Sequence, residues 1–128
     1  METVSADNID IRLRELVENE LIGLCITPEY RGYRCLCLAV ELTVCDEALL
    51  YNITTRLYKT ISQLTGISAA NVERSIRTVI TVMWNEAERD KLNALMGRAY
   101  AAPPGNARFI GVMSRRIAYK YERQKKTE

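Results

Sequence analysis

The residues whose types and spacing best suit binding to another molecule lie in one helical stretch of this 128-residue chain, residues 69–84. At 100° per residue, the apolar face of such a helix consists of Val72, Ile76, Val79, Ile80 and Met83. The opposite face is polar and consists of Ala70, Arg74, Arg77, Thr78 and Thr81, with Asn71 and Glu73 at its edges. Small residues combined with a few long hydrogen-bond donors suit a helix that enters the major groove of DNA.

Arg74 and Glu73 are the candidates for contacts with bases. The guanidinium of Arg74 could form a bidentate bond with guanine, which is worth roughly 1–3 kcal/mol of discrimination. The carboxylate of Glu73 could accept a hydrogen bond from a cytosine amine or orient Arg74. The alternative is a solvated charged face with an i,i+4 ion pair between Glu73 and Arg77, worth roughly a few tenths of a kcal/mol. The residues alone leave both interpretations open.

Composition argues against several other classes of protein. The chain contains no histidine, and it shows no nucleophile paired with a base, no carboxylate pair at fixed spacing and no phosphate-binding loop. We therefore expect no enzymatic activity, no cofactor and no metal. Without an apolar run of about 18 residues, and with a polar, acidic start, we also expect no membrane span, no secretory signal and a cytoplasmic location.

The four cysteines offer no recognisable ligand set for a metal ion. Their spacing matches neither a zinc ribbon nor a zinc finger. We interpret them as buried, reduced thiols that act as small hydrophobic side chains. They are Cys25, Cys35, Cys37 and Cys45.

Helical periodicity recurs along nearly the whole chain and predicts an all-α fold, a compact six-helix domain over residues 1–128. The expected helices cover about 9–24, 33–44, 46–65, 69–84, 89–96 and 107–123. The expected N-caps are Asp7, Asp46, Ser68 and Asn106, and Gly66 and Gly97 are expected to end helices. Leu50, Ile53, Leu57, Ile61 and Leu64 would form the inner stripe of the third helix. We expect residues 1–6 and 124–128 to be frayed.

Residues 57–84 are typical of a helix-turn-helix. Gly66 would end the first helix, and Ser62, four positions earlier, is small enough to let the two helices approach each other. The apolar residues Ile61 and Ile67 flank the turn, and Val72 is expected to lock the second helix against the first. Ser75 stands where the motif usually has an apolar residue, so an ordinary antiparallel helix pair remains an alternative.

Charge is distributed unevenly, although the formal net charge is only +2. Residues 1–30 contain two basic and seven acidic residues, whereas residues 108–128 contain seven basic and two acidic residues. This distribution suits a protein that presents one positive side to a polyanion, and a solvated final helix is the alternative. The basic side chains expected to neutralise phosphates are Lys59, Arg77, Arg115, Arg116 and Lys120.

Several stretches resemble the C-terminal DNA-binding domain of the sporulation stage 0 response regulator, the master transcription factor of endospore-forming bacteria. The similar stretches are Gly32-Tyr33, ELTVCDEALL, LYKTI, NVERSIRTVITVMW, RDKLNALMG and FIGVMSRRI. The most specific piece is Val72-Glu73-Arg74-Ser75-Ile76-Arg77 followed by Trp84. The similarity covers about residues 20–118 and implies a six-helical fold with a central helix-turn-helix.

The resemblance also implies roles for individual residues. Glu73 and Arg74 stand where the family reads bases, and Thr78 stands where it commonly has a His that helps to contact DNA. The implied phosphate contacts are Ser68, Ala70, Asn71 and Arg77. The segment 87–100 matches the region through which the family contacts the sigma subunit of RNA polymerase. The candidate polymerase contacts are Ala87, Glu88, Arg89, Lys91 and Arg98.

We therefore expect a sequence-specific DNA-binding transcription regulator with a recognition helix over about residues 69–84. The expected partners are double-stranded DNA, the sigma subunit of RNA polymerase and a second copy of the chain on tandem sites. The family's N-terminal receiver domain has no counterpart in residues 1–20, so we expect activity that is not gated by a receiver of its own. The alternatives are a helical module that modulates RNA polymerase or a full-length sporulation regulator without binding DNA, and a purely structural helical protein.

Overall fold

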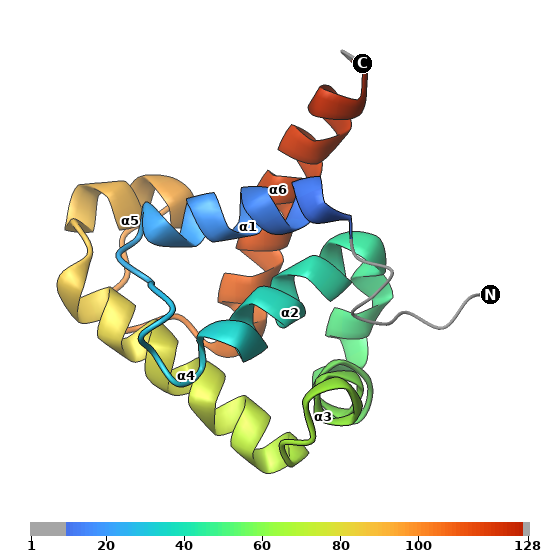
Figure 1. Ribbon diagram of the computed structural model, residues 1–128. Coiled ribbons are helices and arrows are strands. Elements are labelled where there is room, and N and C mark those ends of the chain that lie inside the picture. The colour runs from blue at the N-terminus through green and yellow to red at the C-terminus, as the bar shows by residue number, and fades with distance from the viewer. Residues whose placement is uncertain (1–9, 127–128) are drawn as a thin grey trace.

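Helix α2 (Tyr33–Cys45) lies at the centre of the fold, and the other helices pack around it (Figure 1). The structure, a computed structural model, describes residues 10–126, and every element in this range is helical. In chain order the others are α1 (Ile11–Ile22), the 3-10 helix η2 (Glu47–Asn52), the π-helix η3 (Ile53–Tyr58), α3 (Lys59–Thr65), α4 (Ala69–Glu86), α5 (Arg89–Met96) and α6 (Asn106–Lys126). The expected all-α fold with six α-helices is confirmed.

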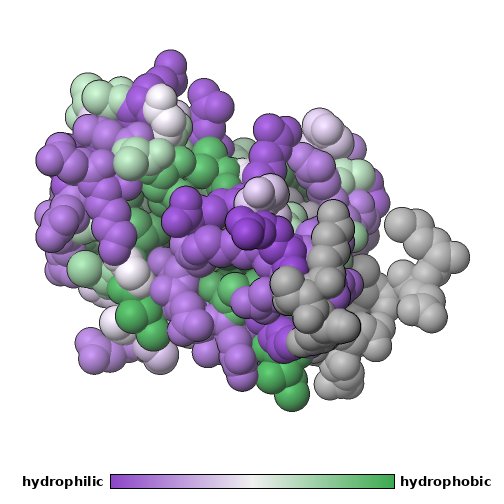
Figure 2. Space-filling view, turned by 90° about the horizontal axis from the view of Figure 1, so that it is seen from above, coloured by the Kyte–Doolittle hydropathy of each residue, from purple (hydrophilic) through white to green (hydrophobic). Residues whose placement is uncertain are grey.

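The burial of α2 follows from a sequence that is apolar on nearly every side. Each residue from Cys35 to Thr43 is buried, and α1 and α6 cover α2 with apolar side chains of their own. Removing this surface from water is the main force that assembles the helices. Seen from above, the surface is mainly hydrophilic, with apolar side chains visible between polar ones (Figure 2). No helix within residues 10–126 is long and apolar enough to cross a membrane.

The third expected helix is divided into three segments. It begins as expected after Asp46, whose carboxylate accepts a hydrogen bond from the N–H of Ala48 at 3.1 Å. The chain then forms η2, η3 and α3 in succession, and Asn52, the last residue of η2, departs from helical geometry with φ of −133° and ψ of 61°. Tighter and wider turns adjust the register. As a result, Leu57 and Ile61 are fully buried, while Leu50, Ile53 and Leu64 are only partly buried.

Helices α1 and α6 begin at other residues than expected. Asp7 lies outside the described residues, and α1 begins at Ile11 after Asp10, whose carboxylate accepts from the N–H of Arg12 at 2.9 Å. Asn106 is the first residue of α6 rather than its N-cap, so that prediction is wrong. Its amide points instead toward α4 and η3. Helix α6 continues to Lys126, beyond the expected end at about residue 123.

The cysteines divide into two groups. Cys35 and Cys37 are buried on α2, as expected, and burial raises the pKa of Cys37 to about 12. Cys25 and Cys45 are exposed, so the prediction of burial is wrong for these two. Cys45 is the last residue of α2, and Cys25 lies three residues after the end of α1. All four are free thiols.

Candidate nucleic-acid interface

The turn between α3 and α4 has the geometry expected from Gly66 and Ser68. Gly66 adopts a left-handed conformation with φ of 78°, and its N–H donates to the carbonyl of Ser62 at 2.8 Å. Ser68 Oγ accepts a hydrogen bond from the N–H of Asn71 at 3.2 Å and so caps α4. These bonds end α3 and start α4 within two residues of each other. The arrangement is that of a helix-turn-helix.

The apolar residues beside the turn differ in burial. Ile61 and Val72 are fully buried and hold α3 against α4. Ile67, which flanks the turn as expected, is 39% exposed.

Helix α4 has the two faces that its periodicity predicts. The buried residues are Val72, Ile76, Val79, Ile80, Met83 and Trp84. The exposed residues of its first four turns are Ala70, Asn71, Arg74, Arg77, Thr78 and Thr81. The polar face therefore points away from the core along its whole length. An element of this kind can be laid into a groove of another molecule without disturbing the fold.

Glu73 and Arg77 form an ion pair on this outward face. Arg77 Nη1 donates to Glu73 Oε1 at 2.9 Å. The side chain of Arg77 is 61% exposed and that of Glu73 is 35% exposed. This is the i,i+4 pair considered as the alternative to base contacts. Solvent exposure keeps it weak, at roughly a few tenths of a kcal/mol. The pair can therefore be exchanged for other partners at small cost.

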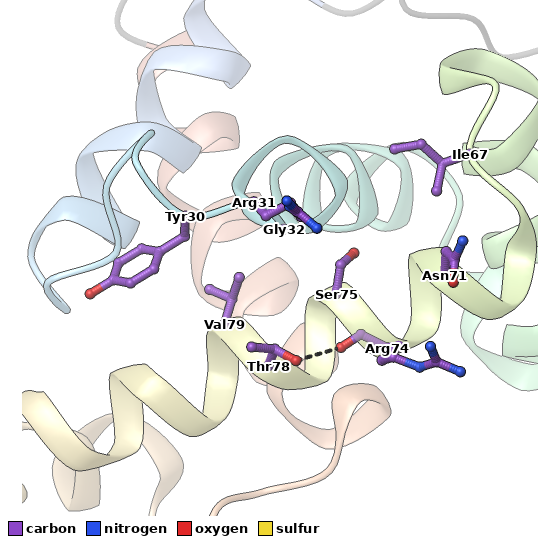
Figure 3. A pocket seen from close by; sticks show the side chains of 9 residues that line it. All are labelled: Tyr30, Arg31, Gly32, Ile67, Asn71, Arg74, Ser75, Thr78 and Val79. Carbon is purple, nitrogen blue, oxygen red and sulfur yellow. Dashed lines mark hydrogen bonds between the residues drawn. The ribbon is translucent and has the colours of Figure 1, made fainter.

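Arg74 and Thr78, unlike Glu73 and Arg77, form no ion pair with each other or with other residues in the part of the chain that the structure describes. Arg74 is exposed, and its guanidinium forms no ion pair or hydrogen bond with residues 10–126. The hydroxyl of Thr78 donates to the carbonyl of Arg74 at 3.0 Å, as Figure 3 shows. Because its proton is used in this way, the exposed Thr78 hydroxyl can act toward another molecule only as an acceptor.

A groove of about 510 Å³ separates one edge of α4 from the loop before α2 (Figure 3). We refer to it as the loop groove. Its main lining residues are Tyr30, Arg31 and Gly32 on the loop and Asn71, Arg74 and Thr78 on α4. None of these six side chains carries a negative charge.

The loop is held on α4 at two points. The Tyr30 hydroxyl donates to Glu86 Oε2 at 2.9 Å, a bond that raises the pKa of Tyr30. Gly32 lies on the backbone of Ser75 so closely that an added Cβ would be 2.3 Å from the carbonyl oxygen. With φ of −88°, the conformation of Gly32 suits any residue, so the close approach itself requires glycine.

A second groove, of about 570 Å³, runs along the opposite edge of α4. We refer to it as the α6 groove, because residues 103–108 form its far wall. Asn106 Nδ2 ties this wall to α4 and η3 by donating to the carbonyl of Glu73 at 3.1 Å and to the Tyr58 hydroxyl at 3.0 Å. Arg108 is exposed on the first turn of α6 and lines the groove.

Five of the predicted phosphate contacts lie in the helix-turn-helix. They are Lys59, at the start of α3, and Ser68, Ala70, Asn71 and Arg77, all of which are exposed. The first N–H groups of a helix have no acceptor within it and attract anions. The start of α4 therefore combines exposed backbone donors with polar side chains.

The other three predicted phosphate contacts lie on α6 and pair with acidic residues. Arg115 contacts Glu47 of η2 at 3.3 Å, and Arg116 contacts Glu20 of α1 at 2.9 Å. Lys120 pairs with the same Glu20 carboxylate. Burial alone would raise the pKa of Glu20, but the hydrogen bonds from these two cations outweigh it and lower the pKa. None of the three basic residues lines either groove beside α4, so their phosphate role stays a prediction.

Residues 87–100 carry five exposed charged side chains after the end of α4, namely Glu88, Arg89, Asp90, Lys91 and Arg98. The Arg89 guanidinium lies 3.9 Å from the ring centre of Trp84, and that of Arg98 lies 4.7 Å from the ring centre of Tyr100. Lys91 Nζ donates to the carbonyl of Gly23 at 2.6 Å, so it helps to end α1. The remaining candidate polymerase contacts are Ala87, which is partly buried, and Glu88, which is exposed.

Sequence reasoning missed Arg31 and Arg108. Each lies across a groove from α4 but is separated from Arg74 by more than 30 residues of chain. Helical periodicity carries no information across such a distance. In the sequence each is only one of the 18 basic residues.

A comparison with known protein families agrees with the site's geometry. The family described as sporulation initiation factor Spo0A C-terminal matches residues 17–117, nearly the range of the resemblance noted in the sequence. The match covers most of the chain and includes the helix-turn-helix and both grooves beside α4. The chain therefore belongs to the sporulation initiation factor Spo0A C-terminal family.

Proposed function

We propose that this chain is a sequence-specific DNA-binding transcription regulator, with α4 as its recognition helix. The observation that carries the proposal is the position of Arg74, exposed on the outward face of α4 and without an ionic partner among residues 10–126. Membership of the sporulation initiation factor family supports a role as the DNA-binding effector domain of a sporulation regulator.

Arg74 reads a guanine, because its guanidinium presents the paired donors that match guanine O6 and N7. Glu73 accepts a hydrogen bond from a cytosine amine once Arg77 turns from Glu73 to a phosphate. The weak, exposed Glu73–Arg77 pair supports this exchange. Thr78 donates its own proton to the Arg74 carbonyl. Its hydroxyl oxygen therefore accepts a hydrogen bond from a base amine, or its methyl group contacts a thymine methyl.

The start of α4 and the neighbouring Lys59 hold phosphates. Ala70 contributes its backbone N–H, whereas Ser68, Asn71 and Arg77 contribute side chains that are exposed around the same turn. Such contacts position the helix in the groove but carry no sequence information. Each one makes binding more sensitive to salt.

Two further contacts follow from the same proposal. Arg89 and Arg98 contact the sigma subunit of RNA polymerase, an assignment favoured by their exposure and by the aromatic rings that hold both guanidinium groups. Because a single recognition helix touches few base pairs, two copies of the chain bind tandem sites.

The proposal is tested by a gel-shift titration with two duplexes of equal length and composition. One carries a binding site of the family type and the other a scrambled version, and both are titrated at two salt concentrations. We expect tighter binding to the first duplex and weaker binding to both at the higher salt. A chain that acts only as a protein-interaction module would show no salt-sensitive binding to either duplex.

A further inference from the structure

We propose that the loop groove and the α6 groove receive the two sugar-phosphate backbones on either side of the DNA major groove. Arg31 clamps one backbone and Arg108 the other. This inference rests on the proposed function and adds two residues outside the helix-turn-helix.

The two grooves flank α4 on opposite edges. Asn71, Arg74 and Thr78 line the loop groove, whereas Glu73, Arg77 and Thr81 line the α6 groove. Helical geometry explains the division, because these two sets diverge to either side of the helix face opposite Val72. The residues proposed to read bases thus lie on α4, between the two outer walls that carry Arg31 and Arg108.

The dimensions of DNA match this shape. A helix with its side chains is about 10–12 Å across, and the major groove is about 12 Å wide. A helix laid into the groove therefore has one phosphodiester backbone along each side. Hollows of about 510 and 570 Å³ leave room for both backbones where a convex surface would collide with them.

Arg31 and Arg108 supply the charge that these positions require. Both are exposed, and neither forms an ion pair or hydrogen bond within the part of the chain that the structure describes. Each lines the wall that faces α4 across its groove. The cations of the second half of α6 differ, because Arg115, Arg116 and Lys120 are already paired with carboxylates.

Both walls are fixed relative to the recognition helix. The contact of Gly32 with Ser75 and the bond from Tyr30 to Glu86 hold the loop that carries Arg31. The bond from Asn106 to the Glu73 carbonyl holds the turn of α6 that carries Arg108. Binding therefore requires no ordering of a mobile backbone segment, a step that would cost conformational entropy. Arg31 and Arg108 can thus set the register of Arg74 on the duplex.

The test compares Arg31→Ala, Arg108→Ala, Arg31→Lys and the control Arg34→Ala in titrations of the two duplexes over a range of salt. Arg34 is an exposed arginine three residues from Arg31, but it lines neither groove beside α4. We expect each clamp alanine variant to weaken binding to both duplexes equally, by about threefold to tenfold at low salt. The slope of log affinity against log salt should fall by about one for each. Arg31→Lys should retain the slope, and Arg34→Ala should behave as wild type.

The outcomes separate the inference from the function on which it rests. If wild type binds DNA in a salt-dependent manner but both clamp alanine variants keep its affinity and slope, the inference is wrong and the proposed function stands. If a clamp variant changes the preference between duplexes rather than the overall affinity, Arg31 or Arg108 reads bases, which also overturns the inference. If wild type shows no salt-dependent binding, both proposals fail. Circular dichroism melting of each variant verifies that the exposed substitutions leave the fold intact.

Discussion

Glu73 and Arg77 neutralise each other on the outward face of α4, with 2.9 Å between Arg77 Nη1 and Glu73 Oε1. The pair places an acid among residues proposed to contact a polyanion. In the free protein this acid pairs with Arg77, and the proposed function makes it an acceptor for a base amine on DNA. In this proposal the same carboxylate affects both the overall affinity for DNA and the preference for one sequence.

Glu73→Gln separates these two effects. We expect tighter binding to the scrambled duplex and a steeper salt dependence, because Arg77 is released and one negative charge is removed. The preference for the family-type site should fall, and the free energy of unfolding should change by only roughly a few tenths of a kcal/mol. Fluorescence anisotropy on both duplexes measures the first two effects. Glu88→Gln, an exposed acid outside both grooves, is the control, and an equal change there would contradict this role for Glu73.

Arg74→Ala is expected to affect specific binding alone. Loss of a bidentate contact with guanine should weaken binding to the family-type duplex by roughly 5- to 150-fold, the equivalent of about 1–3 kcal/mol. Binding to the scrambled duplex should fall only slightly. Competition titrations measure both affinities. A loss of equal size on the two duplexes would make Arg74 a phosphate contact instead.

Gly32→Ala should destabilise the fold although the backbone conformation tolerates alanine. A Cβ at this position would lie 2.3 Å from the carbonyl oxygen of Ser75, which belongs to the backbone and cannot turn aside. We expect a loss of about 1–3 kcal/mol in the free energy of unfolding, measured by urea denaturation. Gly111→Ala is the matched control, because its Cβ would meet the Leu50 side chain at an ordinary 3.5 Å. An unchanged stability of Gly32→Ala would show that the loop does not rest on α4.

Glu41 and Glu20 should give opposite pH dependences of stability. Burial raises the pKa of Glu41, whose side chain is only 1% exposed and contacts Arg14 at 3.4 Å. The folded state therefore holds this proton more tightly than the unfolded chain. The stabilisation is present below the unfolded pKa of about 4.5 and is lost as the pH rises through the folded value. For Glu20, whose pKa is lowered, stabilisation is present above the unfolded pKa and is lost as the pH falls through the folded value.

Denaturation of wild type, Glu41→Gln and Glu20→Gln over a pH series measures both effects. The stability of wild type relative to Glu41→Gln should decrease as the pH rises. Relative to Glu20→Gln it should decrease as the pH falls. Parallel curves for wild type and Glu41→Gln would show that burial does not perturb this carboxyl.

Arg89→Ala and Arg98→Ala should separate DNA binding from transcription. Neither residue lines a groove beside α4, so the affinity for both duplexes should remain that of wild type. Transcription in a reconstituted assay with RNA polymerase should fall, because two rigidly held cations are lost from the surface proposed to contact sigma. Lys91→Ala provides a comparison, since the ammonium group of Lys91 already donates a hydrogen bond to the Gly23 carbonyl. Full transcription by the double variant would remove this surface from the proposal.

Local features of the chain were predictable because local physics produces them. The two faces of α4 follow from helical periodicity, and the ends of α3 and α5 follow from the left-handed conformation that Gly66 and Gly97 adopt. Ser68 caps α4 because its hydroxyl can reach an N–H three residues ahead. The expected positions of Glu73 and Arg74 on the outward face depended on nothing else.

Local expectations failed where contacts between distant segments of the chain override local preferences. Asn106 has the residue type of an N-cap, but tertiary packing brings its amide within reach of Tyr58 and Glu73, and it bonds to them instead. The third helix was expected to be continuous, yet its register is adjusted by η2 and η3 to the core. Exposure of Cys25 and Cys45 likewise depends on where helices end in space.

By itself, the sequence determined that a helix with an outward Arg74 follows a capped turn, because side-chain periodicity and capping act over a few residues. Only the tertiary structure decided which cations are available to a polyanion. Arg116 and Lys120 share the carboxylate of Glu20, which is about 100 residues away in the chain, whereas Arg31 and Arg108 face α4 without such a partner among residues 10–126. Coulombic pairing depends on distance in space, and distance in space is set by the packing of the core.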